Sequence, residues 1–201
     1  MKSLKQYIQE KLVIKSKSKN YKYSPKTKEE LKDIIWERIK TEGKEVDLND
    51  IDTSKITDMS ELFSGLVFNG DISQWDVSNV TNMSFMFCQC KSFNQDISSW
   101  DVSNVIDMRY MFNECKSFNQ DISNWNVSNV TDMTYMFGGC KLFNQDISAW
   151  DVSNVTYMAY MFYDCKSFNQ DLSIWNVSNV KFKNLIFFEC SIDEKYKPKF
   201  K

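Results

Sequence analysis

Apolar side chains recur along this chain with a period of 25 residues. Around each repeat the sequence follows F-N-Q-D-I-S-x-W-[DN]-V-S-N-V-T-x-M-x-x-M-F-x-x-C-K-S. A fixed period of this length indicates a solenoid, in which units too small to bury their own apolar face stack and share one core. The invariant tryptophans of the repeat are Trp75, Trp100, Trp125, Trp150 and Trp175.

Two apolar patterns alternate within each repeat. Met83, Met86, Phe87 and Cys90 follow the spacing i, i+3, i+4, i+7, which predicts one face of a short helix. The stretch 72–77 alternates apolar and polar residues, which predicts one or two very short strands that pair in parallel with the neighbouring repeats. The sequence therefore predicts an α/β solenoid of about six coils, each a short parallel strand plus a short helix.

The repeats divide the chain into three parts. Residues 1–46 precede the repeats, and residues 191–201 form a basic tail after them. The first and last repeats depart from the consensus, as is typical of capping units. The solenoid spans 47–190, with repeats at 47–70, 71–95, 96–120, 121–145, 146–170 and 171–190.

The N-terminal part predicts two helices and a linker. Residues 1–14 form an amphipathic pattern, and the Lys-rich stretch 15–24 indicates a linker. A second helix is expected from about Lys28 to Glu42, because Thr27 and Glu30 match a capping box and Gly43 suits the C-terminal end. This helix should cover the open end of the solenoid core. Its expected apolar stripe is Leu31, Ile34, Ile35, Trp36 and Ile39.

These motifs resemble a known repeat family. The run W-D-V-S-N-V-T-x-M-x-x-M-F-x-x-C-x-x-F-N-Q-D, together with the entry segments 23–31 and 50–54, is similar to the repeat of BspA-like leucine-rich-repeat surface proteins, the Mycoplasma-lipoprotein type. The resemblance covers roughly 23–190. It implies a leucine-rich-repeat-like solenoid, and it implies adhesive or host-contact roles, which are frequent in that family. From the sequence we expect no export signal and no anchor, which departs from that family.

Charge is distributed unevenly along the chain. Residues 1–46 hold 13 Lys/Arg against 7 Asp/Glu, whereas the remainder holds 12 against 20. The basic segment is compatible with an anionic membrane or nucleic acid, but a solvated tether explains it as well, and no nucleic-acid partner is expected. No apolar run is long enough to cross a membrane. We expect a cytoplasmic or virion-associated protein, or a cell-surface protein if another export route operates.

Five of the six cysteines occupy one position of the repeat. The equivalent residue in the first repeat is Leu66, which indicates a small apolar interior site and therefore reduced core thiols rather than disulfides or a metal ladder. Cys88 lies outside this series and is expected to be the exposed, reactive thiol. The five equivalent positions are Cys90, Cys115, Cys140, Cys165 and Cys190.

The recurring Asn-Gln-Asp group, as at 94–96, admits two interpretations. Clustered oxygens suit calcium, but the same side chains can satisfy backbone groups at a corner, and the glycines typical of metal-binding rolls are absent. We favour the structural role and expect no metal or cofactor. An enzyme is not expected either, because the chain has no His and each candidate Asp recurs in several copies.

Helix geometry selects the best candidate for a binding surface. At 100° per residue, position 85 of the repeat points away from the predicted core face, and it carries a column of aromatic side chains. Position 88 beside it varies freely from repeat to repeat. An aromatic column beside a variable column is typical of an interaction face, although the rings could also only seal one helix against the next. The candidate residues are Phe85, Tyr110, Tyr135, Tyr160, Asn113 and Tyr163.

Three hypotheses for function follow. The first is a non-enzymatic solenoid that binds a protein partner through this face. The second is a structural protein, such as a phage-encoded or virion-packaged component. The third is a BspA-like adhesin exported without a recognisable signal. The sequence leaves the partner and the oligomeric state open.

Overall fold

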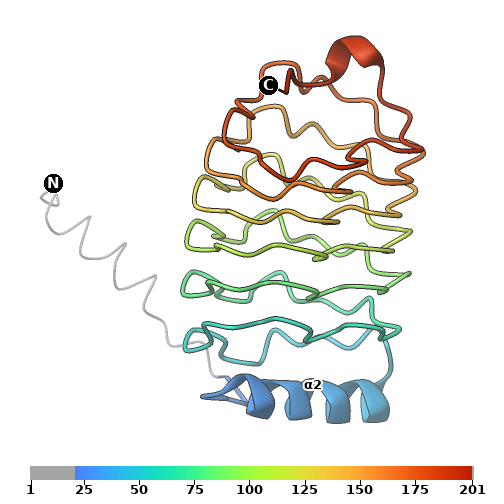
Figure 1. Ribbon diagram of the computed structural model, residues 1–201. Helices are drawn as coiled ribbons and strands as arrows, with labels where there is room; N and C mark the ends of the chain where they lie inside the picture. Colours follow the sequence, from blue (N-terminus) through green and yellow to red (C-terminus); the bar gives the residue numbers. More distant parts are fainter. Residues whose placement is uncertain (1–20, 201) are drawn as a thin grey trace, which may run out of the picture.

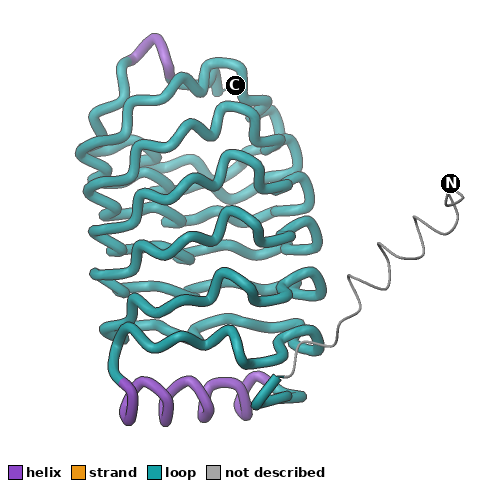
Figure 2. Tube along the Cα trace, turned by 180° about the vertical axis from the view of Figure 1, so that it is seen from behind, coloured by secondary structure: helices purple, strands orange, loops and turns teal. Residues whose placement is uncertain are grey.

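The computed structural model describes residues 21–200. Within this range the helices are α2, Lys28–Glu42, and the short 3-10 helix η1, Glu194–Tyr196. Between them the chain winds in coils that stack one above another, with α2 across one end and η1 near the other (Figure 1). The same stack is visible from behind in Figure 2. The helix predicted for 1–14 and most of the linker lie outside the described residues.

The secondary structure expected inside each repeat is not formed among the described residues. Segment 83–90 is a series of four-residue turns, in which the amide of Cys88 donates to the carbonyl of Phe85 at 3.0 Å. Segment 72–77 also begins with such a turn, so the predicted strands are wrong as well. Neighbouring coils instead meet through single parallel bridges at Asp58, Asn82, Asp107, Asp132, Tyr157 and Phe182.

The failure of the helix prediction has a physical reason. A helix of about eight residues leaves four amides and four carbonyls without intrahelical partners. In the turns, alternate amides bond to carbonyls of the same coil and the others donate to carbonyls of the next coil. More backbone groups therefore have a hydrogen-bond partner than in a short helix. The spacing i, i+3, i+4, i+7 still places Met83, Met86, Phe87 and Cys90 inside, and each is completely buried.

Helix α2 has the predicted bounds and covers one end of the core. Thr27 Oγ1 accepts a hydrogen bond from the amide of Glu30 at 3.2 Å, which confirms the N-cap. Leu31 and Ile35 are completely buried, but Trp36 is 53% exposed, so its place in the predicted stripe is wrong. Arg38 takes that place, because it follows Leu31 by seven residues, and its guanidinium pairs with Asp50 at 2.9 Å.

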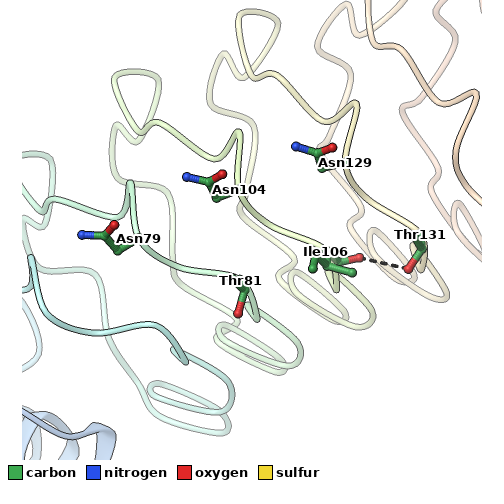
Figure 3. A pocket seen from close by; sticks show the side chains of 6 residues that line it. All are labelled: Asn79, Thr81, Asn104, Ile106, Asn129 and Thr131. Atoms are coloured by element: carbon green, nitrogen blue, oxygen red, sulfur yellow. Dashed lines mark hydrogen bonds between the residues drawn. The ribbon is translucent and has the colours of Figure 1, made fainter.

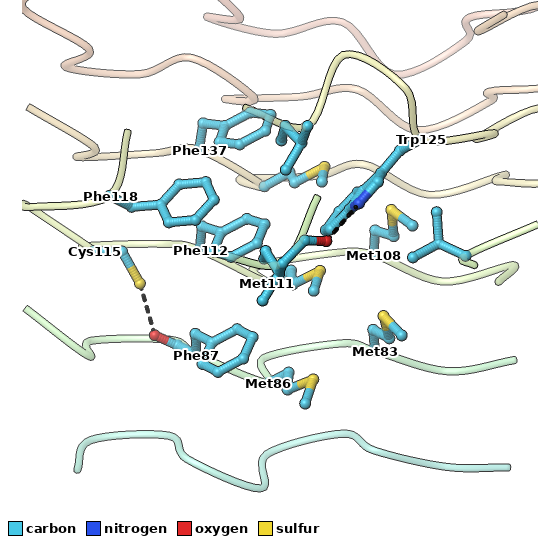
Figure 4. Packing of buried hydrophobic residues seen from close by; sticks show 14 of the residues in the cluster. Met83, Met86, Phe87, Met108, Met111, Phe112, Cys115, Phe118, Trp125 and Phe137 are labelled. Atoms are coloured by element: carbon cyan, nitrogen blue, oxygen red, sulfur yellow. Dashed lines mark hydrogen bonds between the residues drawn. The ribbon is translucent and has the colours of Figure 1, made fainter. Parts of the chain in front are cut away.

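The core consists of columns of identical side chains, one from each coil (Figure 4). Phe87 stacks on Phe112 with 5.7 Å between ring centroids, and Phe112 on Phe137 with 5.8 Å. Trp125 Nε1 donates to the carbonyl of Ile97 in the preceding coil at 3.1 Å. Each column therefore ties a coil to its neighbour by burial and by a directional bond.

The cysteine column is part of this core. Cys90, Cys115, Cys140 and Cys165 are completely buried, and all six cysteines are free thiols. The Cys115 thiol donates to the carbonyl of Phe87 at 2.8 Å (Figure 4). Burial raises the pKa of the Cys90 thiol to about 12. Cys190, in the last coil, is only half-buried.

At the far end, the tail pairs with the coils below it. The amide of Ser191 donates to the carbonyl of Cys165 at 3.3 Å, and the amide of Leu172 donates to the carbonyl of Tyr196 at 2.9 Å. Pro198 is buried and Phe200 packs against the core. The tail therefore covers part of the terminal coil, as α2 does at the opposite end.

Candidate interaction surface

One side of the stack is held by a backbone ladder. The amide of Phe85 donates to the carbonyl of Arg109 at 2.9 Å, and the amide of Phe87 donates to the carbonyl of Met111 at 2.9 Å. The same pairing repeats from coil to coil, so equivalent segments lie side by side. We call this side the ladder face, and it consists of residues 58–65, 82–89, 107–114, 132–139, 157–164 and 182–189.

The four aromatic residues predicted to bind a partner lie on the ladder face in a left-handed backbone conformation. Their φ angles are 58° for Phe85, 57° for Tyr110, 54° for Tyr135 and 59° for Tyr160. A bulky residue in this region costs roughly 1–2 kcal/mol relative to the right-handed region. Each of these residues is the third of a four-residue turn, where a type II turn requires a positive φ. In the structure the column thus faces outward because of the turn conformation, and not because of the predicted helix.

The four rings form one continuous stack, which we call the ring column. Consecutive ring centroids are 4.5, 4.8 and 4.4 Å apart, with interplanar angles of 5°, 17° and 8°. Offset stacking of this kind contributes about 0.5–1.5 kcal/mol per pair, which offsets the conformational cost. The rings are half-buried. They therefore seal the coils against each other and still present one edge to solvent.

Burial also affects the phenols of the ring column. The pKa of Tyr110 is raised, first by loss of solvent and then by the nearby Cys88 and Asp132. The pKa of Tyr135 is raised by loss of solvent and then by Tyr160 and Tyr110. Both phenols are therefore neutral at physiological pH and act as hydrogen-bond donors as well as apolar surface.

The column at position 88 is only partly the free edge that the sequence suggested. Asn113 Nδ2 donates to the carbonyl of Gly138 at 2.9 Å, so this amide bridges two coils. Tyr163 meets Tyr160 edge to face at 6.1 Å. Cys88 is only 7% exposed, and its thiol points to Asn113 Oδ1 of the next coil at 3.7 Å. The prediction of an exposed, reactive thiol, which rested on its place outside the cysteine series, is therefore wrong.

The last two coils carry exposed apolar side chains that the sequence analysis missed. Tyr157 and Phe182 are 43% and 50% exposed and stack on each other at 4.5 Å. Leu185 and Phe188, in the last coil, are 48% and 47% exposed. The available signal was the second residue after the repeated Val (Val80, Val105 and their equivalents), which changes from Asp or Asn to Tyr157 and Phe182 in the last two repeats.

The Asn-Gln-Asp groups serve the backbone. Asn119 Oδ1 accepts from the amide of Asn144 at 2.9 Å, and Gln145 Nε2 donates to the carbonyl of Asn119 at 2.9 Å. Asp121 Oδ1 accepts from the amide of Ser123 at 2.9 Å, and hydrogen bonding from the Ser123 hydroxyl and then from this amide lowers the pKa of Asp121. Residues 21–200 contain no group of three or more Cys, Asp or Glu arranged to hold a metal ion.

A second polar surface lies along the Asn and Thr columns (Figure 3). It is a groove of about 550 Å³ that crosses three coils. Asn104 Nδ2 donates to the carbonyl of Ser78 at 2.7 Å, and Asn129 Nδ2 donates to that of Ser103 at 2.7 Å. These amides are engaged in holding the coils together. The lining residues are Asn79, Thr81, Asn104, Ile106, Asn129 and Thr131.

Together these observations define a protein of stacked 25-residue repeats with an aromatic, laddered side. A family model described as Mycoplasma protein of unknown function, DUF285, matches residues 35–140 and 120–195. The chain belongs to this family. No curated protein and no solved structure matches the chain. Within residues 21–200, no helix is long and apolar enough to cross a membrane.

Proposed function

We propose that this chain is a non-enzymatic protein-binding protein, that its stack is a leucine-rich-repeat-like solenoid of the BspA-like kind, and that its ladder face is the binding surface. The observation that carries the proposal is the ring column. At the other left-handed column of the ladder face the residues are polar, acidic or Gly, as at Gln89, Glu114 and Gly139. In the ring column, by contrast, bulky aromatic side chains sit in this strained backbone conformation, and they face outward.

Spacing along the stack supports the same surface. Ring centroids on the ladder face are 4.4–4.8 Å apart, whereas those of the interior Phe87, Phe112 and Phe137 column are 5.7–5.8 Å apart. The backbone bonds between coils are equally long at the two columns, 2.9 Å from the amide of Phe85 and 2.9 Å from that of Phe87. The closer ring spacing is therefore a property of the side chains, and it makes the ring column a continuous aromatic surface of the kind found at protein interfaces.

The second candidate function is structural, as a phage-encoded or virion-associated component, and the third is surface adhesion. Two observations favour a surface role. The chain matches a Mycoplasma family of unknown function, and its repeat resembles that of BspA-like surface proteins. Cytoplasmic or virion-associated placement is our working proposal, with the cell surface as the alternative. The location of the protein does not change which face of the stack would bind a partner.

The test replaces Tyr110 and Tyr135 together by Ser and measures both thermal unfolding and partner capture. If the ring column binds, capture is lost while the variant remains folded. The matched control replaces two exposed apolar residues elsewhere, Leu142 and Ile174, which are 56% and 76% exposed. Normal capture by a folded double variant would refute the binding role, and a large fall in melting temperature would show that the rings only seal the coils.

A further inference from the structure

The outward columns of the ladder face change in one direction along the stack. In the first coil Glu61 occupies the position of the ring column, and in the last coil Leu185 occupies it, with left-handed φ angles of 61° and 50°. Glu61 and Leu185 are both exposed. The bridge column, whose residues pair neighbouring coils, changes in the same way from carboxyl and amide groups to rings. Its members are Asp58, Asn82, Asp107, Asp132, Tyr157 and Phe182.

The variable column at position 88 follows the same trend. It begins with Ser64 and ends with Tyr163 and Phe188, whose rings stack with 5.7 Å between their centroids. Phe188 is 47% exposed. Three columns of the ladder face therefore become apolar together in the last two coils, while the same columns carry the carboxylates in the first four.

Two carboxylates of the first four coils have no partner of opposite charge. Glu61 and Asp132 form no ion pair with any residue in 21–200. Asp132 instead lies beside Asp107 in the bridge column, so that like charges are neighbours. A cation supplied by a partner would reduce this repulsion. The other carboxylates here each have one cation at 3.5–3.6 Å: Asp58 has Lys28, Asp107 has Arg109 and Glu114 has Lys116.

Asp132 lies next to the ring column. Its carbonyl accepts from the amide of Met108 at 3.0 Å, and two residues further on the carbonyl of Thr134 accepts from the amide of Tyr110 at 2.8 Å. Loss of solvent raises the pKa of Tyr110 most, and the charges of Cys88 and Asp132 add to this effect. The carboxylate is thus within electrostatic reach of the phenol. A guanidinium suits such a place, because it pairs with carboxylates and also stacks on aromatic rings.

We propose that the ladder face binds a short segment of a partner protein that places an arginine or lysine at the middle coils and apolar side chains at the last two. The inference rests on the proposed function, because this segment would lie along the ring column. Side chains would carry the recognition, since the backbone amides of the middle coils already bond between coils or within their own turns.

The spacing of the coils gives the spacing within the segment. Coils joined by parallel bridges lie about 4.8 Å apart, so Asp132 and Phe182, which are two coils apart, are separated by about 10 Å. An extended chain covers this distance in about three residues. The basic and the apolar residues of the segment should therefore be about three positions apart.

A second copy of the chain does not fit this face. If two copies met in antiparallel orientation, the apolar end of each face would lie on the carboxylates of the other. In parallel orientation, carboxylates would face carboxylates. Both arrangements bury charge without a partner, which is costly.

The experiment titrates the full-length, isotope-labelled protein with the synthetic peptide Ser-Arg-Arg-Ser-Leu-Phe-Ser and follows the amide and ring resonances. The matched control peptide has Glu in place of both Arg. The basic peptide should shift the resonances of Tyr110, Tyr135 and Phe182, and its affinity should fall as salt is added. The Glu peptide should leave these resonances unchanged at the same concentration.

A charge variant tests the role of the unpaired carboxylate. Asp132→Asn should weaken binding of the basic peptide roughly two- to fivefold at low salt, the range expected for one exposed ion pair. The fold tolerates this change, because Asn82 occupies the equivalent position and its Oδ1 accepts from the amide two residues on at 2.9 Å. Asp151→Asn is the control outside the ladder face. It makes the same charge change at a position where Asn126 is the equivalent residue, and it should have no effect.

The results separate this inference from the proposed function. Equal binding of the two peptides at the ring column would overturn the inference and leave the ring column as a binding surface. Shifts confined to residues outside the ladder face, or unchanged affinity in Asp132→Asn, would also overturn it. So would a failure of both peptides to shift the ring column, and capture by the double Tyr variant would then decide the proposed function on its own. A dimer in sedimentation that hides the ladder face would assign the face to a second copy and overturn the inference as well.

Discussion

Replacing Trp125 tests the energetic basis of the stack directly. Its indole is 3% exposed, lies against Phe112 at 6.2 Å between ring centroids, and donates from Nε1 to the carbonyl of Ile97 at 3.1 Å. Trp125→Ala removes the largest side chain of a central coil and leaves a cavity between two neighbours. We expect the free energy of unfolding to fall by about 3–5 kcal/mol, as for other large aromatic residues truncated in cores.

A second substitution at this site separates packing from hydrogen bonding. Trp125→Phe keeps most of the ring but removes the Nε1 donor. The carbonyl of Ile97 also accepts from the amide of Trp100 at 3.2 Å, so it is not left without a partner. The expected loss is that of a single hydrogen bond, about 1 kcal/mol, plus the packing lost with the missing ring atoms, and it should stay below the loss in Trp125→Ala.

The measurement is urea unfolding followed by the fluorescence of the remaining tryptophans. Trp36→Ala is the matched control, because this residue is 53% exposed on α2 and should change stability by less than about 0.5 kcal/mol. If Trp125→Ala unfolds within about 1 kcal/mol of the parent, the tryptophan column does not hold the coils together and the account of the core is wrong.

Two further predictions concern the cysteines. In the folded protein the pKa of Cys90 is about 12, and the pKa values of Cys115, Cys140 and Cys165 lie well above the ordinary value of 9.0. The folded protein therefore favours neutral thiols. The stability that this gives is complete below about pH 9 and is lost as the pH rises toward 12. Unfolding at increasing alkaline pH should show a loss of about 1.4 kcal/mol per pH unit for each thiol, and a flat profile would contradict the burial. Thiol labelling of the native protein should modify the half-buried Cys190 first and the five buried thiols, Cys88 among them, only after unfolding. Cys190→Ser is the control that should abolish the fast phase.

The repeat period and the interior positions could be predicted from sequence because burial selects residue type strongly. Cys140 and Trp125 are buried, as a repeated apolar position requires. Helix α2 could be predicted because Thr27 and Gly43 mark its ends by local hydrogen bonding. These features depend on the chemistry of a few residues and not on how coils meet.

The backbone path within each repeat could not be predicted in the same way. The spacing of Met83, Met86 and Phe87 fits a helical turn and also fits consecutive four-residue turns, since both bring these side chains to one side. The choice depends on hydrogen bonds between coils, such as that from Phe87 to Met111, and these are not local in sequence. The errors at Cys88 and Trp36 have other origins. Cys88 was expected to be exposed because it lies outside the cysteine series, and Trp36 was assigned to the buried stripe of a helix whose bounds are correct.

The ladder face changes in character along the stack, and this matters for any partner that lies along it. At the bridge position the residues run from Asp107 and Asp132 in the middle coils to Tyr157 and Phe182 at the end. Asp107 and Asp132 are paired directly at this position. Loss of solvent raises the pKa of Asp107, and the neighbouring Asp132 adds to this. A partner along this face would meet carboxylates in the middle coils and exposed rings in the last two. Only one orientation would satisfy both, so a repeat protein with nearly identical coils can still present a surface with direction.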